Sequence, residues 1–155
     1  MPLRNPLELP SQGKIAAFDV GEKTIGVAVC DALRIAASPR QTLKRSKWAE
    51  DKAQLAKLIA AEKLVAGVVG LPLNMDGSQG QSADRAQSFA HLLETELNLP
   101  VLLWDERLST VAAESALFEQ RTGRQTRASR KDVKQQVDSV AAALILQGVL
   151  DRLRG

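Results

Sequence analysis

The sequence is poor in the residues on which several common kinds of protein depend. A single cysteine, Cys30, excludes a disulfide within the chain and is typical of a reducing cytoplasm, where we expect the protein to reside. A single histidine, His91, falls on a predicted helix and argues against a histidine general base. No apolar run approaches the roughly 18 residues of a membrane span, and residues 1–12 lack an apolar signal-peptide core, so we expect neither a membrane anchor nor export.

Positive charge is modest overall but concentrated in one segment. The formal net charge is +3, yet residues 121–134 carry six basic residues against one acid, Asp132, so the rest of the chain is net negative. The six are Arg121, Arg124, Arg127, Arg130, Lys131 and Lys134. Such a run is either a solvated loop or a surface that contacts a polyanion such as nucleic acid.

Aromatic residues are also scarce, and this absence narrows the kind of nucleic acid that would fit. All of them occupy predicted core positions: Phe18, Trp48, Phe89, Trp104 and Phe118. Without a stacking platform, recognition of a single strand through its bases is a poor fit. Structured RNA or branched DNA, recognised by shape and phosphate, fits better.

Alternating strand-like and helix-like patterns predict an α/β protein. The expected strands cover 14–20, 25–30, a stretch between Leu33 and Leu43, 64–71 and 101–104; the expected helices cover 47–62, about 83–97, a segment from Ser109 or Thr110 that breaks near Thr122-Gly123, and 131–153. This order predicts a mixed five-stranded sheet, three antiparallel strands followed by two parallel ones, with helices on both faces. We expect one domain over 13–155, preceded by a flexible tail over 1–12.

Three acids occupy positions where an ionised side chain is costly. Asp19 and Asp105 end apolar strands, and Asp138 interrupts an apolar stripe of the last predicted helix, which continues through positions 141, 142, 145 and 149. Burying a carboxylate costs several kcal/mol or more unless something compensates the charge. We therefore predict that Asp19, Asp105 and Asp138 surround a divalent cation.

Carboxylate oxygens without cysteine or histidine select Mg²⁺ or Mn²⁺ over zinc. Two such ions about 4 Å apart can activate water and stabilise a leaving oxygen, so the site predicts phosphodiester cleavage. The alternative for Asp138 is a structural acid that caps the helix or pairs with Arg107 or Lys134.

Four blocks of sequence follow one another in the order AFDVGEKTIGVAVCD (17–31), VVGLPLNMDG (68–77), VLLWDERLST (101–110) and RKDVKQQVDSVAAALIL (130–146). In content and order they resemble the YqgF (RuvX) family of RNase H-like proteins. The resemblance implies an RNase H-like fold and a cytoplasmic bacterial nuclease that matures the 5′ end of pre-16S ribosomal RNA. It also implies that Asp19, Asp105 and Asp138 match the family's acidic positions, with Glu106 as an alternate or supporting ligand.

One departure from the related Holliday-junction resolvases affects the site. Those proteins carry an acid on the strand that reads Val68-Val69-Gly70-Leu71 here, and this chain has none there. The second ligand must come instead from the Asp105-Glu106-Arg107 triplet. Three further residues are supporting candidates: Gly21 for close approach of a phosphate or metal, Lys23 for a phosphate, and Arg107 for holding a carboxylate or contacting the scissile phosphate.

Three other functions remain open at this point. The first is a Holliday-junction nuclease, for which a homodimer would supply two coordinated cuts. The second is a catalytically silent RNA-binding factor in ribosome assembly. The third is an ATP-binding protein of the actin and sugar-kinase type, which is disfavoured because 155 residues leave no second domain to close over a nucleotide.

Overall fold

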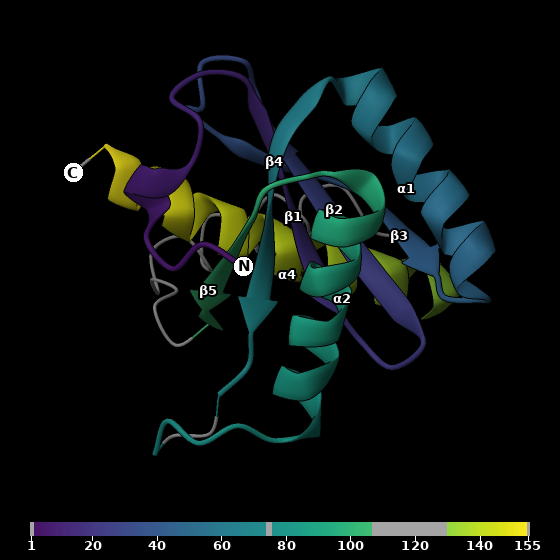
Figure 1. Ribbon diagram of the computed structural model, residues 1–155. Coiled ribbons are helices and arrows are strands. Elements are labelled where there is room, and N and C mark those ends of the chain that lie inside the picture. Colours follow the sequence, from purple (N-terminus) through teal and green to yellow (C-terminus); the bar gives the residue numbers. More distant parts are fainter. Residues whose placement is uncertain (1, 74–75, 107–129, 155) are drawn as a thin grey trace.

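A five-stranded mixed sheet forms the centre of the computed structural model, which describes residues 2–73, 76–106 and 130–154, with backbone only over 130–138 (Figure 1). The strands are β1 (Lys14–Val20), β2 (Thr24–Cys30), β3 (Ala37–Lys44), β4 (Leu64–Leu71) and β5 (Val101–Asp105). Their spatial order is β3-β2-β1-β4-β5. The pairs β1–β2 and β2–β3 are antiparallel, whereas β1–β4 and β4–β5 are parallel, which confirms the predicted sheet.

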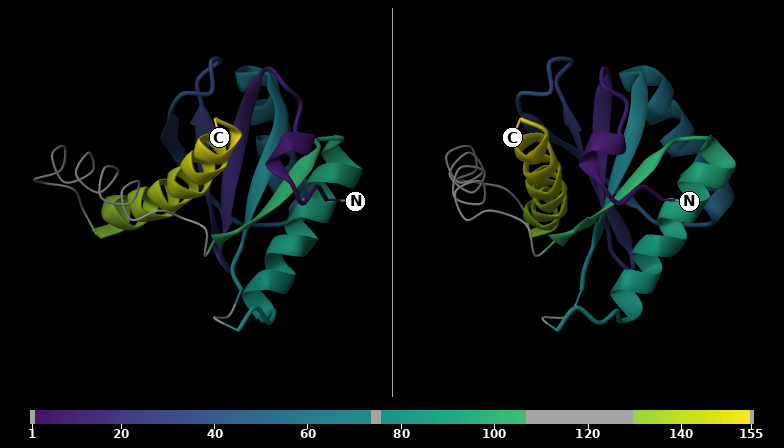
Figure 2. Two further views of the ribbon diagram at one scale, coloured as in Figure 1. Left: turned by 90° about the vertical axis from the view of Figure 1, so that its left-hand side faces the viewer. Right: turned by 60° about the vertical axis from the view of Figure 1, so that its left-hand side comes forward.

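Helices cover both faces of this sheet (Figure 2). Helices α1 (Trp48–Glu62) and α2 (Gln81–Leu97) pack on one face, in a core cluster that contains Phe18 and Phe89. Helix α4 (Arg130–Leu153) packs on the other face, in a second cluster with Trp104. The helix expected from Ser109 or Thr110 lies outside the described residues.

Side-chain alternation along the strands divides the two clusters. In β1, Ala16, Phe18 and Val20 face α1 and α2, whereas Ile15 and Ala17 face α4. Successive side chains of a strand point to opposite faces, so the same pattern places the next residue of the α4 series, position 19, under α4. Strand β4 is buried on both faces, which explains its nearly continuous apolar run.

Local signals in the sequence set several boundaries correctly. Pro39 lies on the edge strand β3, where the register shifts opposite Ala28, and a proline is tolerated at such a bulge. Asn98 ends α2 in the left-handed conformation at φ 53°. The β1–β2 turn closes with a 2.8 Å hydrogen bond from the Gly21 amide to the Thr24 carbonyl.

The N-terminal segment, for which the sequence predicts a flexible tail, contacts the outer edge of β5 in the structure. The Leu3 amide donates to the Val101 carbonyl at 2.7 Å, and the Leu103 amide donates to the Leu3 carbonyl at 3.1 Å. The short helix η1 (Pro6–Glu8) follows, and Leu9 is buried in the α4-side cluster. The segment thus adds one bridge to the outer edge of β5 and extends the core, which local sequence patterns do not reveal.

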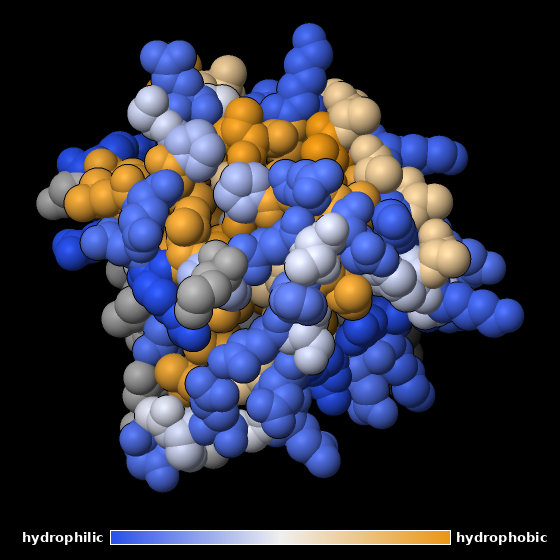
Figure 3. Space-filling model, in the orientation of Figure 1, coloured by the Kyte–Doolittle hydropathy of each residue, from blue (hydrophilic) through white to orange (hydrophobic). Residues whose placement is uncertain are grey.

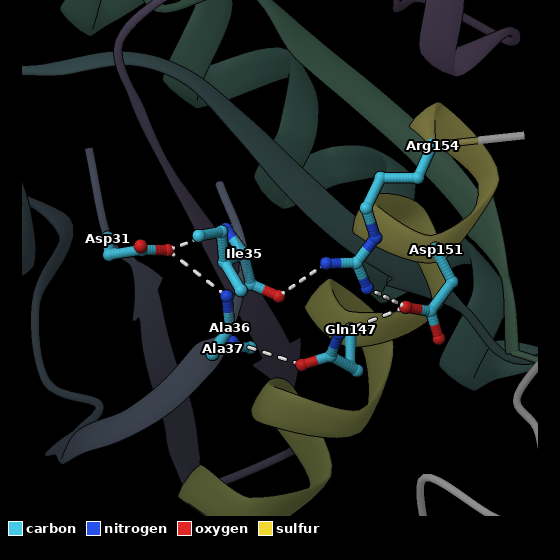
Figure 4. A network of polar contacts seen from close by, with 7 residues as sticks. All are labelled: Asp31, Ile35, Ala36, Ala37, Gln147, Asp151 and Arg154. Atoms are coloured by element: carbon cyan, nitrogen blue, oxygen red, sulfur yellow. Dashed lines mark hydrogen bonds and ion pairs between the residues drawn. The ribbon is translucent and has the colours of Figure 1, made fainter. Parts of the chain in front are cut away.

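The C-terminal half of α4 is fastened to the loop between β2 and β3 (Figure 4). Asp31 accepts hydrogen bonds from the Ile35 and Ala36 amides at 2.7 and 3.1 Å, and the Ala36 bond in particular lowers the pKa of its carboxyl. Gln147 Oε1 accepts from the Ala37 amide at 3.1 Å, and Arg154 Nη1 donates to the Ile35 carbonyl at 2.8 Å. These contacts hold α4 at a defined place across the sheet.

Within the described segments, no helix combines the length and apolar character that a membrane crossing would require.

Replacing Leu9 by alanine tests the packing of the N-terminal segment. We expect Leu9→Ala to lower the free energy of unfolding by about 2–3 kcal/mol, because a buried side chain is removed from a packed core. Leu7→Ala is the matched control, since Leu7 lies in the same segment and is 75% exposed; it should change stability by less than about 0.5 kcal/mol. Equally small effects in urea denaturation would show that the segment does not belong to the core.

Candidate functional site

Three parallel strands end together at one edge of the sheet, and the predicted acids come from that edge. Strand β4 lies between β1 and β5, with Phe18 paired to Val69 and Gly70 paired to Trp104. Asp19 therefore lies at the end of β1 on one side of Gly70, and Asp105 ends β5 on the other. Ligand sites of parallel sheets gather at such carboxyl ends.

Glu106 leans back over β4 towards β1. A Cβ atom added to Gly70 would lie only 2.5 Å from Glu106 Oε1 and 2.5 Å from Ile145 Cδ1, so the glutamate carboxylate and the α4 side chain meet above this glycine. Strands β1 and β5 are two strand spacings apart, about 10 Å. Because Gly70 has no side chain, Glu106 can cross part of that gap on the face that Asp19 shares.

The acids interact electrostatically. The pKa of Glu106 is raised from 4.5 to about 7, first by burial, then by the negative charge of Asp19 and then by that of Asp105. Asp19 acts more strongly than Asp105, although Asp105 is the neighbour in sequence. This order fits the alternation of β5, which directs Leu103 towards α1 and α2 and Trp104 towards α4, so that position 105 belongs to the series of Leu103.

Asp138 was predicted to complete this group from α4. Its side chain lies outside the described part of the chain, and its backbone lies on α4 two turns before Ile145, which contacts the site. The predicted apolar stripe is partly corrected: Ala142, Ile145 and Val149 are buried, but Ala141 is only half-buried. The buried face instead includes Ala143, Leu146 and Leu150.

The donors present suit a hard divalent cation. All of them are carboxylate oxygens, the ligands that Mg²⁺ and Mn²⁺ prefer. Burial raises the pKa of Glu106 first, and the negative charges of Asp19 and Asp105 raise it further; a cation beside Glu106 would relieve that repulsion. Within residues 2–73, 76–106 and 139–154, no group of three or more acidic, histidine or cysteine side chains is already drawn together as a metal-binding set. A closed site therefore needs movement of these side chains or a ligand from beyond this part of the chain.

The other candidate residues fall into two sets. Gly21 and Lys23 lie in the β1–β2 turn next to Asp19, and a Cβ atom at Gly21 would lie 3.1 Å from the Thr24 carbonyl oxygen, so the turn itself favours glycine there. Lys23 is exposed. Arg107 and the basic segment through Arg121, Arg124 and Arg127 lie outside the described residues, as do the side chains of Arg130, Lys131 and Lys134.

Two features of this region were not predicted. Gly70 provides the gap through which Glu106 reaches, and Arg45 donates from Nη1 to the Gly21 carbonyl at 2.9 Å, which ties the end of β3 to the turn after Asp19. The sequence did hold a signal for the gap at Gly70, because the strand over residues 68–71 carries no acid of its own. His91 is exposed on α2, on the face opposite Asp19, in agreement with a site that uses no histidine.

Comparison with known proteins gives a consistent result over almost the whole chain. The family RuvX, described as "Holliday junction resolvase", matches residues 13–152. A protein of Cereibacter sphaeroides named "Putative pre-16S rRNA nuclease" is 52% identical over 145 residues, which cover 94% of this chain and 87% of the relative. A Paracoccus denitrificans protein of the same name is 51% identical over 146 residues, covering 94% and 89%.

The solved structures support the fold. The Thermus thermophilus RuvC structure in complex with a Holliday junction substrate has a TM-score of 0.56 at 16% identity and covers 91% of this chain and 96% of its own. A second T. thermophilus RuvC structure has a TM-score of 0.52 at 14% identity, with the same coverage. These values confirm the RNase H-like fold predicted from the sequence.

Substituting Gly70 by alanine tests whether Glu106 belongs to a metal site. The new Cβ atom would displace the Glu106 carboxylate, so we expect Gly70→Ala to weaken Mn²⁺ binding about tenfold in calorimetry. Gly67→Ala is the matched control, because a Cβ there meets Leu99 and Phe18 at 3.1 and 3.2 Å on the opposite face. Equal Mn²⁺ affinities for the two variants would remove Glu106 from the metal site.

The raised pKa of Glu106 predicts a pH-dependent stability in the metal-free protein. A carboxyl whose pKa is higher in the folded state stabilises the fold below its unfolded value, and this stability is lost as pH rises through the folded value. The free energy of unfolding of the wild type should therefore fall between about pH 4.5 and 7. In Glu106→Gln this fall should be smaller by about 1–2 kcal/mol, a figure lower than the full pKa shift implies because Glu106 is partly exposed. Urea denaturation in a chelator across this range measures it, with the exposed Glu22→Gln as control; identical pH profiles for wild type and Glu106→Gln would contradict the burial of this carboxyl.

Proposed function

This chain belongs to the RuvX family, and from that premise we propose that it is a metal-dependent nuclease that cleaves phosphodiester bonds in structured nucleic acid. The observation that carries the proposal is the Glu106 carboxylate above Gly70, whose pKa is raised to about 7 by burial and by the negative charges of Asp19 and Asp105. Acids held together against their repulsion are a costly arrangement that a cation-dependent reaction would explain.

The proposed substrate is precursor 16S ribosomal RNA, processed at its 5′ end in the cytoplasm. The support is that relatives 51–52% identical over 94% of this chain carry that name. The scarcity of aromatic residues also favours a structured substrate that is recognised through its phosphates.

Asp19, Glu106 and Asp105, with Asp138 from α4, are the proposed ligands of Mg²⁺ or Mn²⁺, in a two-ion arrangement. When bound, such ions supply an activated water and stabilisation of the leaving oxygen. Geometry favours Glu106 over Asp105 as the principal partner of Asp19, because Glu106 occupies the α4 side of the sheet.

The protein's own groups prepare this site in three ways. Asp19 lies near the end of the buried strand β1 and Glu106 directly follows the buried strand β5, so the sheet fixes the positions of their backbones. Ile145 of α4 packs over Gly70 beside the Glu106 carboxylate. Metal binding requires the ionised form of Glu106, so below about pH 7 protons compete for the site.

A Holliday-junction nuclease is the second candidate. Its support is the description of the family as "Holliday junction resolvase", together with the likeness of the fold to RuvC. A homodimer would suit this activity, since a four-way junction requires two coordinated cuts. A catalytically silent assembly factor is the alternative outside enzymes, and it predicts binding without cleavage.

Asp19→Asn tests the proposed chemistry. The protein is incubated with Mn²⁺ and either a pre-16S RNA fragment or a four-way DNA junction, and products are resolved on a denaturing gel. We expect cleavage of the RNA by wild type and a loss of at least about a hundredfold in Asp19→Asn, with RNA binding retained. Asp84→Asn is the matched control, because Asp84 is exposed on α2, and it should cleave like wild type.

Each contrary result has a distinct meaning. Equal cleavage by wild type and Asp19→Asn would reject the acidic site as the source of activity. Cleavage of the junction but not of the RNA would replace the first candidate by the second. Binding of RNA by wild type without cleavage in Mg²⁺ or Mn²⁺ would favour the silent assembly factor.

A further inference from the structure

Strand β3 delivers basic residues to the same edge of the sheet as the acids. It is antiparallel to β2, which is antiparallel to β1, so β3 runs in the direction of β1 and its carboxyl end lies at the edge where Asp19 and Asp105 lie. The chain leaves β3 through Lys44, Arg45, Ser46 and Lys47 before α1 begins at Trp48.

The register of the sheet places Lys44 on the face of Asp19. Asp19 pairs with Gly26 and Gly26 with Thr42, and directly paired residues share a face. Lys44 lies two residues beyond Thr42, so its side chain belongs to the same series, while Leu43 packs into the core on the α1 and α2 side. Lys44 is exposed.

The β1–β2 turn adds a further cation, Lys23, beside the end of β3. The Arg45 amide donates to the Lys23 carbonyl at 2.9 Å, and Arg45 Nη1 donates to the Gly21 carbonyl at 2.9 Å. The turn and the end of β3 are therefore joined. We call the resulting group the β3 rim; it consists of Lys23, Lys44, Arg45 and Lys47.

The four cations of the β3 rim have three acids near them in sequence. The nearby acids in sequence are Glu22, Glu50 and Asp51. Asp51 is buried and accepts hydrogen bonds from Ser46, and Glu50 accepts from the Ser46 hydroxyl at 2.7 Å. The surface where the turn and the end of β3 lie is hydrophilic in Figure 3. The lysines of the rim, all exposed, thus outnumber the exposed acids beside them.

We propose that the β3 rim binds the phosphate backbone of the nucleic acid as it passes away from the catalytic acids. The inference rests on the proposed nuclease function and extends it to a second contact surface, separate in sequence from the basic segment 121–134. Two strand spacings and two residues along the strand separate Lys44 from Asp19, about 12 Å between backbones. Measured along the axis of a duplex, that distance covers about three or four phosphates of one strand, at roughly 3.4 Å each.

A continuous backbone of phosphates suits this surface better than a small anion does. The rim residues come from two segments that Arg45 joins, and the lysines among them are exposed. Exposed lysines attract phosphates but do not recognise bases. They would therefore position a structured substrate without sequence specificity.

The test compares two triple variants with the same loss of charge. The rim variant carries Lys23→Ala, Lys44→Ala and Lys47→Ala; Arg45 is kept because it holds the turn. The control variant carries Lys57→Ala, Lys63→Ala and Arg152→Ala, at exposed positions on α1, after α1 and near the end of α4. Both are made in the Asp19→Asn background, so that binding is measured without cleavage.

Affinity for a fluorescent double-stranded RNA is measured over a series of KCl concentrations. The rim variant should bind at least about tenfold more weakly at low salt, and its slope of log affinity against log salt should be smaller by about two to three. The control variant should keep the affinity and slope of the Asp19→Asn parent. A variant with arginine in place of Lys23, Lys44 and Lys47 should keep most of the affinity of the parent.

Three results would overturn the inference. These are unchanged affinity of the rim variant, an equal loss in rim and control variants, and a parent that binds no RNA. A melting temperature matched to the parent shows that a loss of affinity in the rim variant is not unfolding. Failure of the nuclease proposal is distinguishable: Asp19→Asn would then still cleave while the rim variant still loses binding.

Discussion

Repulsion between carboxylates at the carboxyl edge of the sheet is the constraint on which the proposed site depends. Asp19 and Glu106 come from strands that do not touch, and β4 separates them. They influence each other because Gly70 leaves room above β4 and because α4 covers that space with Ile145. Burial, followed by the negative charges of Asp19 and Asp105, raises the pKa of Glu106 to about 7. A divalent cation would make the electrostatic energy of this arrangement favourable, because the neighbouring carboxylates would then be ligands of one ion.

Much of the fold follows from local patterns in the sequence. The hairpin around Gly21, the end of α2 at Asn98 and the edge position of Pro39 each have a local physical cause, and the order of strands and helices then allows few sheets. The contact of the N-terminal segment with the sheet was not predicted, because it depends on one bridge between Leu3 and Leu102, a pairing distant in sequence. Nothing in residues 1–12 alone indicates that partner.

The candidate site could be predicted in composition but not in geometry. Asp19 and Asp105 were identified because charged residues at the ends of apolar strands are unusual, and Glu106 was expected as a supporting ligand. The alternation of β5 and the gap at Gly70 place Glu106, rather than Asp105, on the side of Asp19. The Glu106 carboxylate reaches the space above Gly70 from the neighbouring strand, although β4 itself carries no acid there.

The central claim, that a divalent cation compensates mutually repelling carboxylates, is tested most directly by a ¹³C NMR titration of the side-chain carboxyl of Glu106. Without metal, the account predicts a pKa near 7, and in saturating Mg²⁺ it predicts a pKa shifted well below that value. A metal-free pKa at the ordinary 4.5, or a raised pKa that Mg²⁺ leaves unchanged, would contradict the account.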